Sequence, residues 1–551
     1  MADKIIGIFK RAAAVSAAAF LCAACVSCGG RETPARKAAE RGILLMGNAA
    51  DPASLDPALS TGLSEFKILS GLFEGLVGAD SRTLRPIPAV AKTWKISGDG
   101  KKYTFYLDES AKWSDGSQVV AGDFVFAWRR VVNPRLGAEY ASLMFPIKNA
   151  RAINSGEISD LSALGVRAVS DRVLEVELEE PTPYFLSLLY HNVYFPVSKK
   201  NLEKFNAAQT RDSLWTRPKN MVCNGAFTLD YWSINEKVSV RKNPAYRDAK
   251  NIFLNGVDYL PISNINTEDR AFRAGQLHIT DSIAPSRIDA VKRGSPETLR
   301  RDDWLGVYYY MFNTRKPPFD DVRVRRAFAM SVDRRLIIDS FLKAGQKSAY
   351  SFVPDNCDGY ILEESRKIKF DVSAARKLLA EAGYPGGKGF PRVRLTYNTS
   401  EQHKPIAEAV QQMWKKNLGV EVELYNLSWP AYLAARREGD FEIARSSWVG
   451  DFAAPESFLQ NFESASGLNH TGFSDARYDS LLRAAALSKE RSQRLENLAD
   501  AEALMLESAP IVPLYFYARV YRISPMVENW TSNLLDYHDY KGVRLNPEAE
   551  K

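Results

Sequence analysis

Residues 393–424 combine two strand patterns with a helix between them. Apolar residues alternate with polar ones over 393–397 and again over 420–424, and those between 406 and 414 recur at helical spacing. Two strands joined by a helical crossover favour parallel pairing with a right-handed connection. This order places the segment in the α/β class, in which helices cover the faces of a sheet.

Strand and helix signals alternate in other parts of the chain as well. Residues 103–107 are predicted to form a strand and residues 124–132 a helix, with Gly122 or Asp123 as its N-cap. Strand signals dominate from 167 to 266, which predicts a mixed sheet. A chain of 551 residues favours more than one domain. We therefore expect several α/β domains, with mixed sheets flanked by helices and no long linker between them.

Residues 1–28 have the pattern of an export signal, with cationic residues before an uncharged run that begins at Ala12. Small residues precede both Cys25 and Cys28, which resembles a bacterial lipobox, where signal peptidase cuts before a cysteine that then carries lipid. Cys28 is the favoured lipidation site and Cys25 the alternative; an ordinary secretory signal is the other interpretation. We expect residues 29–41 to be a polar tether, with the protein anchored to a membrane in the periplasm or at the cell surface.

Cysteine usage excludes a disulfide framework. Of the five cysteines, only Cys223 and Cys357 lie outside the signal region. One bridge between them is possible in an oxidising compartment, but the sequence alone does not give their separation.

Sequence motifs for catalysis are missing. The chain has no G-x-S-x-G, no G-x-G-x-x-G and no Walker A sequence, and its five histidines are scattered without metal-ligand spacing. Lys and Arg (73) outnumber Asp and Glu (66), but the signs are interspersed, which argues against a nucleic-acid partner. We expect no enzyme, no cofactor and no metal site, with a carboxylate-based hydrolase as a weak alternative. A ligand receptor fits better, because aromatic residues supply contact area in clefts between domains.

An ordered set of short motifs runs from about residue 43 to residue 540. They are SLDP, LFEGL, AKWSDG with DFVFAWRRVVNP, YAS, EPTPYFLSLL, NGAF with RKNPAY, YYYMFNT with KPPFDDVRVRRAFAMSVDR, LLAEAGYP, YNTSEQHK, WKKNLGV, SWVGDF with PESFL, and IVPLYFY. Together they resemble the oligopeptide-binding proteins of bacterial ABC importers, within the peptide/nickel-binding class of solute receptors.

The resemblance implies a fold like that of periplasmic binding proteins, with two lobes, an extra domain and a ligand cleft between the lobes. The expected partition assigns residues 42–73, 199–305 and 539–551 to lobe I, 74–198 to the extra domain and 306–538 to lobe II. Short peptides would lie extended in the cleft, bonded through their backbone as an added strand. The closed receptor, a monomer, would deliver them to an ABC permease.

Asp451 is the most distinctive site residue that the resemblance implies. It lies inside WVGDF, where a buried charge without a partner would be costly. The matching family position receives the N-terminal ammonium of the peptide, so the partner would arrive with the ligand. The alternative is a solvated loop acid before a helix that starts near Pro455.

The remaining candidates match family positions around the ligand. Four of them could meet the peptide carboxylate, different ones for different peptide lengths: Arg445, Arg436, His403 and Lys316. Three are aromatic residues that would line the cleft: Tyr140, Trp429 and Trp448. The alternatives are surface charges for the Arg and Lys side chains, a helix-end position for the histidine and core packing for the aromatics.

Three departures from the close enteric relatives concern the same site. Ser446 and Ser447 replace small apolar residues or glycine, Gly306 and Val449 stand where those relatives place a disulfide pair, and Thr61 occupies an acidic position. The resemblance therefore leaves ligand length and preference open.

Alternative functions divide into two groups. The same receptor class also binds dipeptides, murein peptides or nickel complexes. A lipoprotein recruited as an adhesin or signalling sensor would keep the fold without transport.

Overall fold

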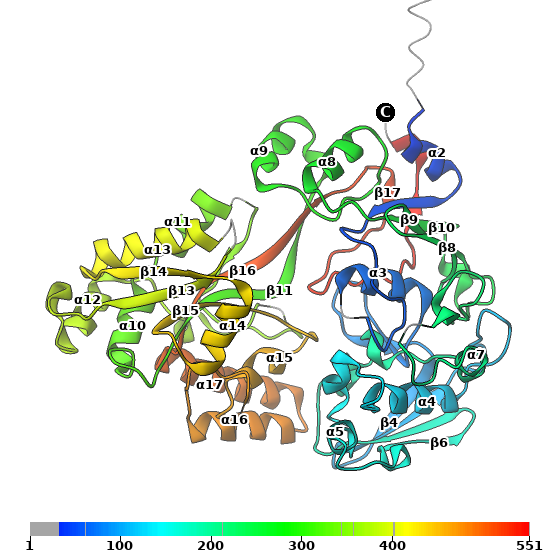
Figure 1. Ribbon diagram of the computed structural model, residues 1–551, viewed down its shortest axis with the longest axis horizontal. Helices are drawn as coiled ribbons and strands as arrows, with labels where there is room; N and C mark the ends of the chain where they lie inside the picture. The colour runs from blue at the N-terminus through cyan, green and yellow to red at the C-terminus, as the bar shows by residue number, and fades with distance from the viewer. Residues whose placement is uncertain are drawn as a thin grey trace, which may run out of the picture.

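The computed structural model describes residues 32–549, apart from residues 61, 212, 343, 356, 400–402 and 465. Within this part of the chain, three sheets of four or more strands each form the centre of a separate body. Figure 1 shows the body with the largest sheet on the left and the other two on the right. The signal peptide 1–28, with Cys25 and Cys28, lies outside the described residues.

Lobe I is the body built on the sheet β1-β10-β9-β8, with α3, α8 and α9 beside it. The strands are β1 (Ile43–Gly47), β8 (Phe227–Ser233), β9 (Lys237–Lys242) and β10 (Gly256–Leu260), and the helices are α3 (Leu63–Leu72), α8 (Ile265–Arg273) and α9 (Pro285–Gly294). β1 runs parallel to β10 and the other pairs are antiparallel, so this sheet is mixed.

The expected tether is wrong from residue 34 onward, because Pro34–Glu40 form helix α2. Thr33 caps the helix through its side chain, and a proline follows at the first helical position. Ala35 and Ala39 share one helix face and pack with Met526, so these small residues dock the segment on the body.

The extra domain is the body built on the antiparallel sheet β4-β5-β7-β6. Its strands are β4 (Ala91–Ile96), β5 (Lys102–Leu107), β6 (Val166–Ser170) and β7 (Val173–Glu177), and a short hairpin, β2 (Val77–Ala79) and β3 (Pro86–Pro88), precedes them. The mixed sheet expected over 167–266 is thus divided between two bodies, because β7 pairs with the distant strand β5. One continuous hydrophobic core joins this domain to lobe I.

Helix α4 (Ala121–Val132) confirms the predicted helix, but its N-cap is Val120 instead of Gly122 or Asp123. The Asp123 carboxylate accepts the backbone N–H of Val120 and the indole N–H of Trp113, each at 3.0 Å. The carboxylate therefore stabilises the first turn from inside the helix.

Lobe II is the body built on the six-stranded sheet β12-β16-β11-β15-β13-β14. The strands are β11 (Leu299–Phe312), β12 (Lys347–Ser348), β13 (Val393–Asn398), β14 (Val422–Leu427), β15 (Ile443–Val449) and β16 (Ile511–Arg522). The predicted strand–helix–strand unit is confirmed: helix α13 (His403–Leu418) connects β13 to β14, which pair in parallel. β15 is also parallel to β13, whereas β11 and β16 are antiparallel to their neighbours.

Helices cover both faces of the lobe II sheet, over two separate hydrophobic cores. The helices are α10 (Val322–Met330), α12 (Val372–Glu381), α14 (Trp429–Glu438), α16 (Ala476–Leu487) and α17 (Arg491–Ser508). Cys223 and Cys357 are both free thiols, buried in different cores, so the possible bridge between them does not form.

The strands β11 and β16 cross from lobe I to lobe II (Figure 1). After β16 the chain turns back onto lobe I: Ile523 N–H bonds the Thr298 carbonyl, and Ser524 N–H bonds the His278 carbonyl. The last strands, β17 (Val527–Glu528) and β18 (Arg544–Leu545), pair with each other there. Within the described residues, no helix combines the length and apolar character that crossing a membrane requires.

Candidate functional site

Three parallel strands of lobe II end at the same edge of the sheet. β13 leads to His403 at the start of α13, β14 leads to Trp429 at the start of α14, and β15 leads to Asp451. In open parallel sheets, ligands bind in the crevice outside the carboxyl ends of the strands. The topology thus brings three predicted positions to one edge, although the side chain of Trp429 is not among those that the structure describes.

The Asp451 carboxylate is exposed at this edge and has no cationic partner among the described residues. Its backbone N–H donates to Ser457 Oγ at 3.0 Å, and the Trp448 indole N–H donates to the Ser457 carbonyl at 2.6 Å. Ser457 therefore fixes the turn that presents the acid. The surrounding walls restrict solvation of the charged form and raise the pKa of Asp451 to about 6.

A cavity of about 760 Å³ opens beside Asp451, between lobe II and the extra domain. Trp448 and Phe452 line it from lobe II, and Phe145 and Tyr184 line it from the extra domain. Tyr184 also stacks on Phe452, with ring centroids 4.5 Å apart. The predicted aromatic Trp448 thus forms part of the wall.

Tyr140 approaches Asp451 from the extra domain. It lies in the short helix Glu139–Met144, and its ring contacts that of His191 with centroids 5.1 Å apart. Burial raises the pKa of Tyr140, and the negative charge of Asp451 raises it further. The charge of Asp451 therefore acts on Tyr140, although the two residues belong to different bodies.

Arg445 is a buried arginine without an acidic partner. It lies on β15 and is 8% exposed, with its guanidinium 4.7 Å from the centroid of the Tyr308 ring. Its Nη2 donates to the Tyr517 hydroxyl at 3.4 Å, and Nε has no partner within the described chain. A guanidinium buried against tyrosines alone is costly, so this position suits an incoming anion.

His403 shares the Tyr308 side chain with Arg445. Its Nδ1 lies 3.3 Å from the Tyr308 hydroxyl, and the two ring centroids are 5.6 Å apart. Burial, together with the charge of Arg445, lowers the pKa of His403 to about 4. The imidazole is therefore neutral near pH 7, and it can donate one N–H to a ligand.

Arg436 and Lys316 lie apart from this pair. Arg436 is on α14 with its guanidinium 5.6 Å from the Tyr432 ring centroid, and its Nε has no partner among the described residues. Lys316 is half-buried in the turn after β11, beyond the end of the strand farther from lobe I. No contact within the described part of the chain joins Lys316 to Arg445, Arg436 or His403.

Two of the three predicted departures fall in the β11–β15 ladder. Gly306 and Val449 are directly opposite each other there, and neither has a thiol, so no disulfide joins the strands where a cysteine pair could. Ser446 is fully buried, and its hydroxyl has no partner among the described residues. Thr61 is outside the described residues.

Tyr308, Tyr517 and Ser457 were not predicted as site residues. Tyr308 belongs to the aromatic run VYYYMF, but its contact with Arg445 depends on the register between β11 and β15. The contact of Tyr517 with Arg445 depends in addition on the pairing of β16 with β11. No group of three or more potential metal ligands gathers in the described chain.

Comparisons with known proteins cover almost the whole chain. Residues 85–470 match the family described as bacterial extracellular solute-binding proteins, family 5 Middle. The periplasmic oligopeptide-binding protein OppA of Escherichia coli is 37% identical over 500 residues, 90% of each chain. The unliganded open form of the periplasmic murein tripeptide binding protein MppA superposes with a TM-score of 0.83 at 36% identity, over 92% of this chain and 98% of that one.

A complex of Haemophilus influenzae OppA with the peptide RPPGFSPFR superposes less closely. Its TM-score is 0.69 at 31% identity, over 92% of this chain and 99% of that one. These matches bear out the predicted three-domain α/β fold and the absence of an enzymatic role.

Proposed function

Since the chain belongs to the bacterial extracellular solute-binding proteins of family 5 and is an extracytoplasmic peptide-binding receptor of ABC transport, we propose that it captures short peptides by both of their charged ends. Asp451 receives the N-terminal ammonium and Arg445 the C-terminal carboxylate. The peptide backbone adds to the cleft as an extended strand.

The observation that carries this proposal is a pair of unmatched charges, Arg445 on β15 and Asp451 two residues after the end of that strand. Asp451 has no cation and Arg445 has no anion among the described residues. Asp451 is six positions after Arg445, so their Cα atoms are at most roughly 20 Å apart at ~3.3 Å per residue, and the long arginine side chain shortens the distance between the charges. A zwitterionic peptide of about three to five residues spans such a distance better than a dipeptide does, at ~3.3 Å per residue.

Other lengths would use other carboxylate partners. His403 lies at the carboxyl ends of the parallel strands, Arg436 lies in the last turn of α14, and Lys316 lies beyond the far end of β11; each can donate a hydrogen bond to a carboxylate. Tyr140, Trp429 and Trp448 supply apolar contact area for peptide side chains.

The peptide contacts both lobes only when they approach each other, so it binds the closed form more tightly than the open form. This difference in affinity shifts the population toward the closed form when peptide binds. The closed receptor then presents the peptide to an ABC permease. An N-terminal lipid on Cys28, or on Cys25, holds the receptor at the membrane. No step in this cycle requires a cofactor or a second copy of the chain.

A murein peptide is the second candidate ligand, because the open form of the murein tripeptide receptor superposes with a TM-score of 0.83. A murein tripeptide that binds more tightly than trialanine would favour this ligand.

Native mass spectrometry of residues 32–551, followed by denaturing release, tests the proposal. We expect co-purified short peptides with free N-termini that are lost in Asp451→Ala. A single non-peptide mass, or no bound mass together with no response to added peptides, would contradict it and favour a metal complex or a recruited sensor.

A further inference from the structure

The two strands that join the lobes have two irregularities in their pairing, and the one nearer lobe I leaves three residues of β11 opposite one residue of β16. The ladder between β11 and β16 stops after Asp303 and resumes at Val307. Residues 304–306 of β11 therefore face Tyr517 of β16 alone. Such a bulge bends the strand and weakens the ladder locally.

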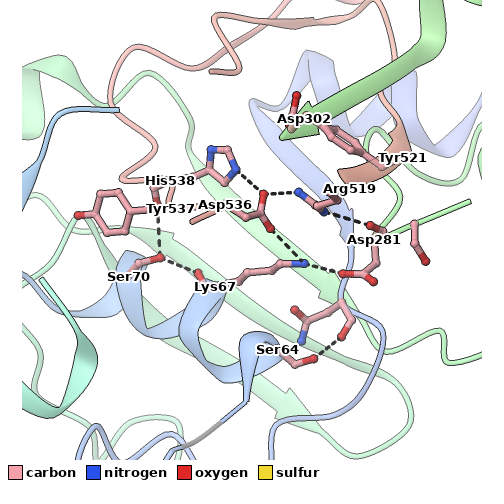
Figure 2. A network of polar contacts seen from close by, with 12 residues as sticks. Ser64, Lys67, Ser70, Asp281, Asp302, Arg519, Tyr521, Asp536, Tyr537 and His538 are labelled. Carbon is pink, nitrogen blue, oxygen red and sulfur yellow. Dashed lines mark hydrogen bonds and ion pairs between the residues drawn. The ribbon is translucent and has the colours of Figure 1, made fainter. Parts of the chain in front are cut away.

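The lobe I side of this bulge is held by a buried network of charges, shown in Figure 2. Arg519, two residues beyond Tyr517, donates to the Asp281 carbonyl at 3.2 and 3.3 Å and pairs with Asp536. The Lys67 ammonium lies 2.5 Å from the Asp281 carboxylate and 3.8 Å from that of Asp536. These contacts fix β16 to α3 and to the returning C-terminal segment.

The lobe II side is held by apolar packing. Leu305, Val307 and Phe516 are buried in one of the lobe II cores. The backbone of Leu305 also bonds Leu534 and Gly450, and Gly306 pairs with Val449 of β15, so bending between the lobes is concentrated at Trp304 and Tyr517.

Tyr517 connects this point to the ligand edge. Its hydroxyl accepts a hydrogen bond from Arg445, and its ring centroid lies 6.0 Å from that of Trp304. Gly306 leaves room for the ring, because a Cβ there would lie 2.5 Å from Tyr517 Cδ2. The same side chain thus contacts the guanidinium and fills the inside of the bulge.

We propose that Tyr517 is a positioning residue that transmits the occupancy of Arg445 by a carboxylate to the hinge between the lobes. The inference rests on the proposed function for the source of that carboxylate. A carboxylate takes two N–H groups of a guanidinium in a fork, whereas the bond to Tyr517 is long and single. Binding therefore reorients Arg445 and changes its bond to Tyr517 at the point where the strands bend.

The test compares Tyr517→Phe with wild type, using trialanine, tetraalanine and pentaalanine with free or amidated C-termini. We expect about a three- to tenfold loss of affinity for free-carboxylate peptides, the range of an ordinary net hydrogen bond, because the contact with Tyr517 is long. The loss should be confined to the lengths that Arg445→Gln also weakens, with amidated peptides unaffected. Tyr521→Phe is the matched control, because its hydroxyl bonds Asp302 on the lobe I side.

Trp304 gives a second readout at the bulge itself. In protein labelled with 5-fluorotryptophan, Trp304→Phe assigns the Trp304 resonance by its disappearance. We expect saturating peptide to shift this resonance in wild type and to shift it less in Tyr517→Phe. Gly306→Ala should also reduce the shift, because its methyl group would meet the Tyr517 ring.

Equal losses for free and amidated peptides, no loss in Tyr517→Phe, or an unchanged Trp304 shift would each overturn the inference and leave the proposed function intact. Wild-type protein that binds none of the peptides would overturn both. The coupling between Arg445 and the hinge is supported only if the loss of affinity is confined to free-carboxylate peptides and the shift of the Trp304 resonance is reduced in Tyr517→Phe.

Discussion

Arg519 and Arg445 are two arginines on strands of the same sheet, the first largely buried and the second buried, and they differ in what they face. The guanidinium of Arg519 lies against the Asp536 carboxylate and a backbone carbonyl, inside a network that the chain completes by itself. Arg445 lies against tyrosines, with one N–H left without a partner in the described chain. A buried charge that the fold pairs cannot lose its partner without a large cost in stability, and one left unpaired is available to a ligand.

The largest expected effect is on stability at the paired site. Arg519→Met leaves the buried Asp536 carboxylate short of its main partner, so we expect a loss of about 3 kcal/mol in the free energy of unfolding. Urea unfolding of the peptide-free protein measures it. Arg445→Met is the matched control and should change stability by no more than about 1 kcal/mol, because no carboxylate loses a partner. Equal losses in the two variants would contradict the distinction.

The next effect is on binding at the unpaired site. Asp451→Asn keeps the shape of the side chain and removes its charge. We expect roughly a hundredfold weaker binding of a free tetrapeptide, because one partner of a charge-assisted hydrogen bond is lost. Isothermal titration calorimetry with free and N-acetylated peptides measures this. The acetylated peptide should bind weakly to both proteins; a further loss for it in Asp451→Asn would indicate a structural role for the acid.

A smaller effect on peptide affinity is expected when the pH is lowered. The ammonium binds the charged carboxylate, so binding lowers the Asp451 pKa from its peptide-free value of about 6. Affinity is then fully present above pH 6 and falls as pH decreases, by about tenfold between pH 7 and pH 5. His403, with a pKa of about 4, stays neutral over this range. Asp451→Asn should bind with the same affinity at both pH values, and tighter wild-type binding at pH 5 would contradict the assignment.

The smallest expected effect is on the stability of the peptide-free protein, which the charged Asp451 side chain lowers. The folded pKa of Asp451 lies above the ordinary value of about 3.9, so folding disfavours the charged form. This penalty is present above pH 6 and disappears below about pH 4. Because water reaches the group, Asp451→Asn should raise the peptide-free Tm by only about 1–2 °C at pH 7. Differential scanning calorimetry at pH 7 and pH 4 checks it, and an increase at pH 4 alone would have the wrong sign.

The sequence predicted the local elements that follow from periodicity. β13, α13 and β14 form as expected, because alternation and helical spacing are properties of neighbouring residues. The prediction of Asp451 as a ligand-binding residue depended on the family resemblance, since a single acid between aromatic residues has no periodic pattern.

Long-range pairing was not predictable in the same way. The division of residues 167–266 between two sheets depends on which distant strand each segment meets. Helix α2 was missed because its small, polar sequence becomes ordered through alanine contacts with Met526, almost five hundred residues later. The contact between Tyr517 and Arg445 likewise needs β11, β15 and β16 in register.

Helix α2 and the C-terminal segment meet on lobe I, where the Arg36 guanidinium lies 3.2 Å from the Glu548 carboxylate. Immobilising the protein on a sensor surface through a C-terminal tag would therefore hold it on the side of helix α2. In that arrangement lobe I is the part next to the surface, and lobe II is the part that moves relative to it.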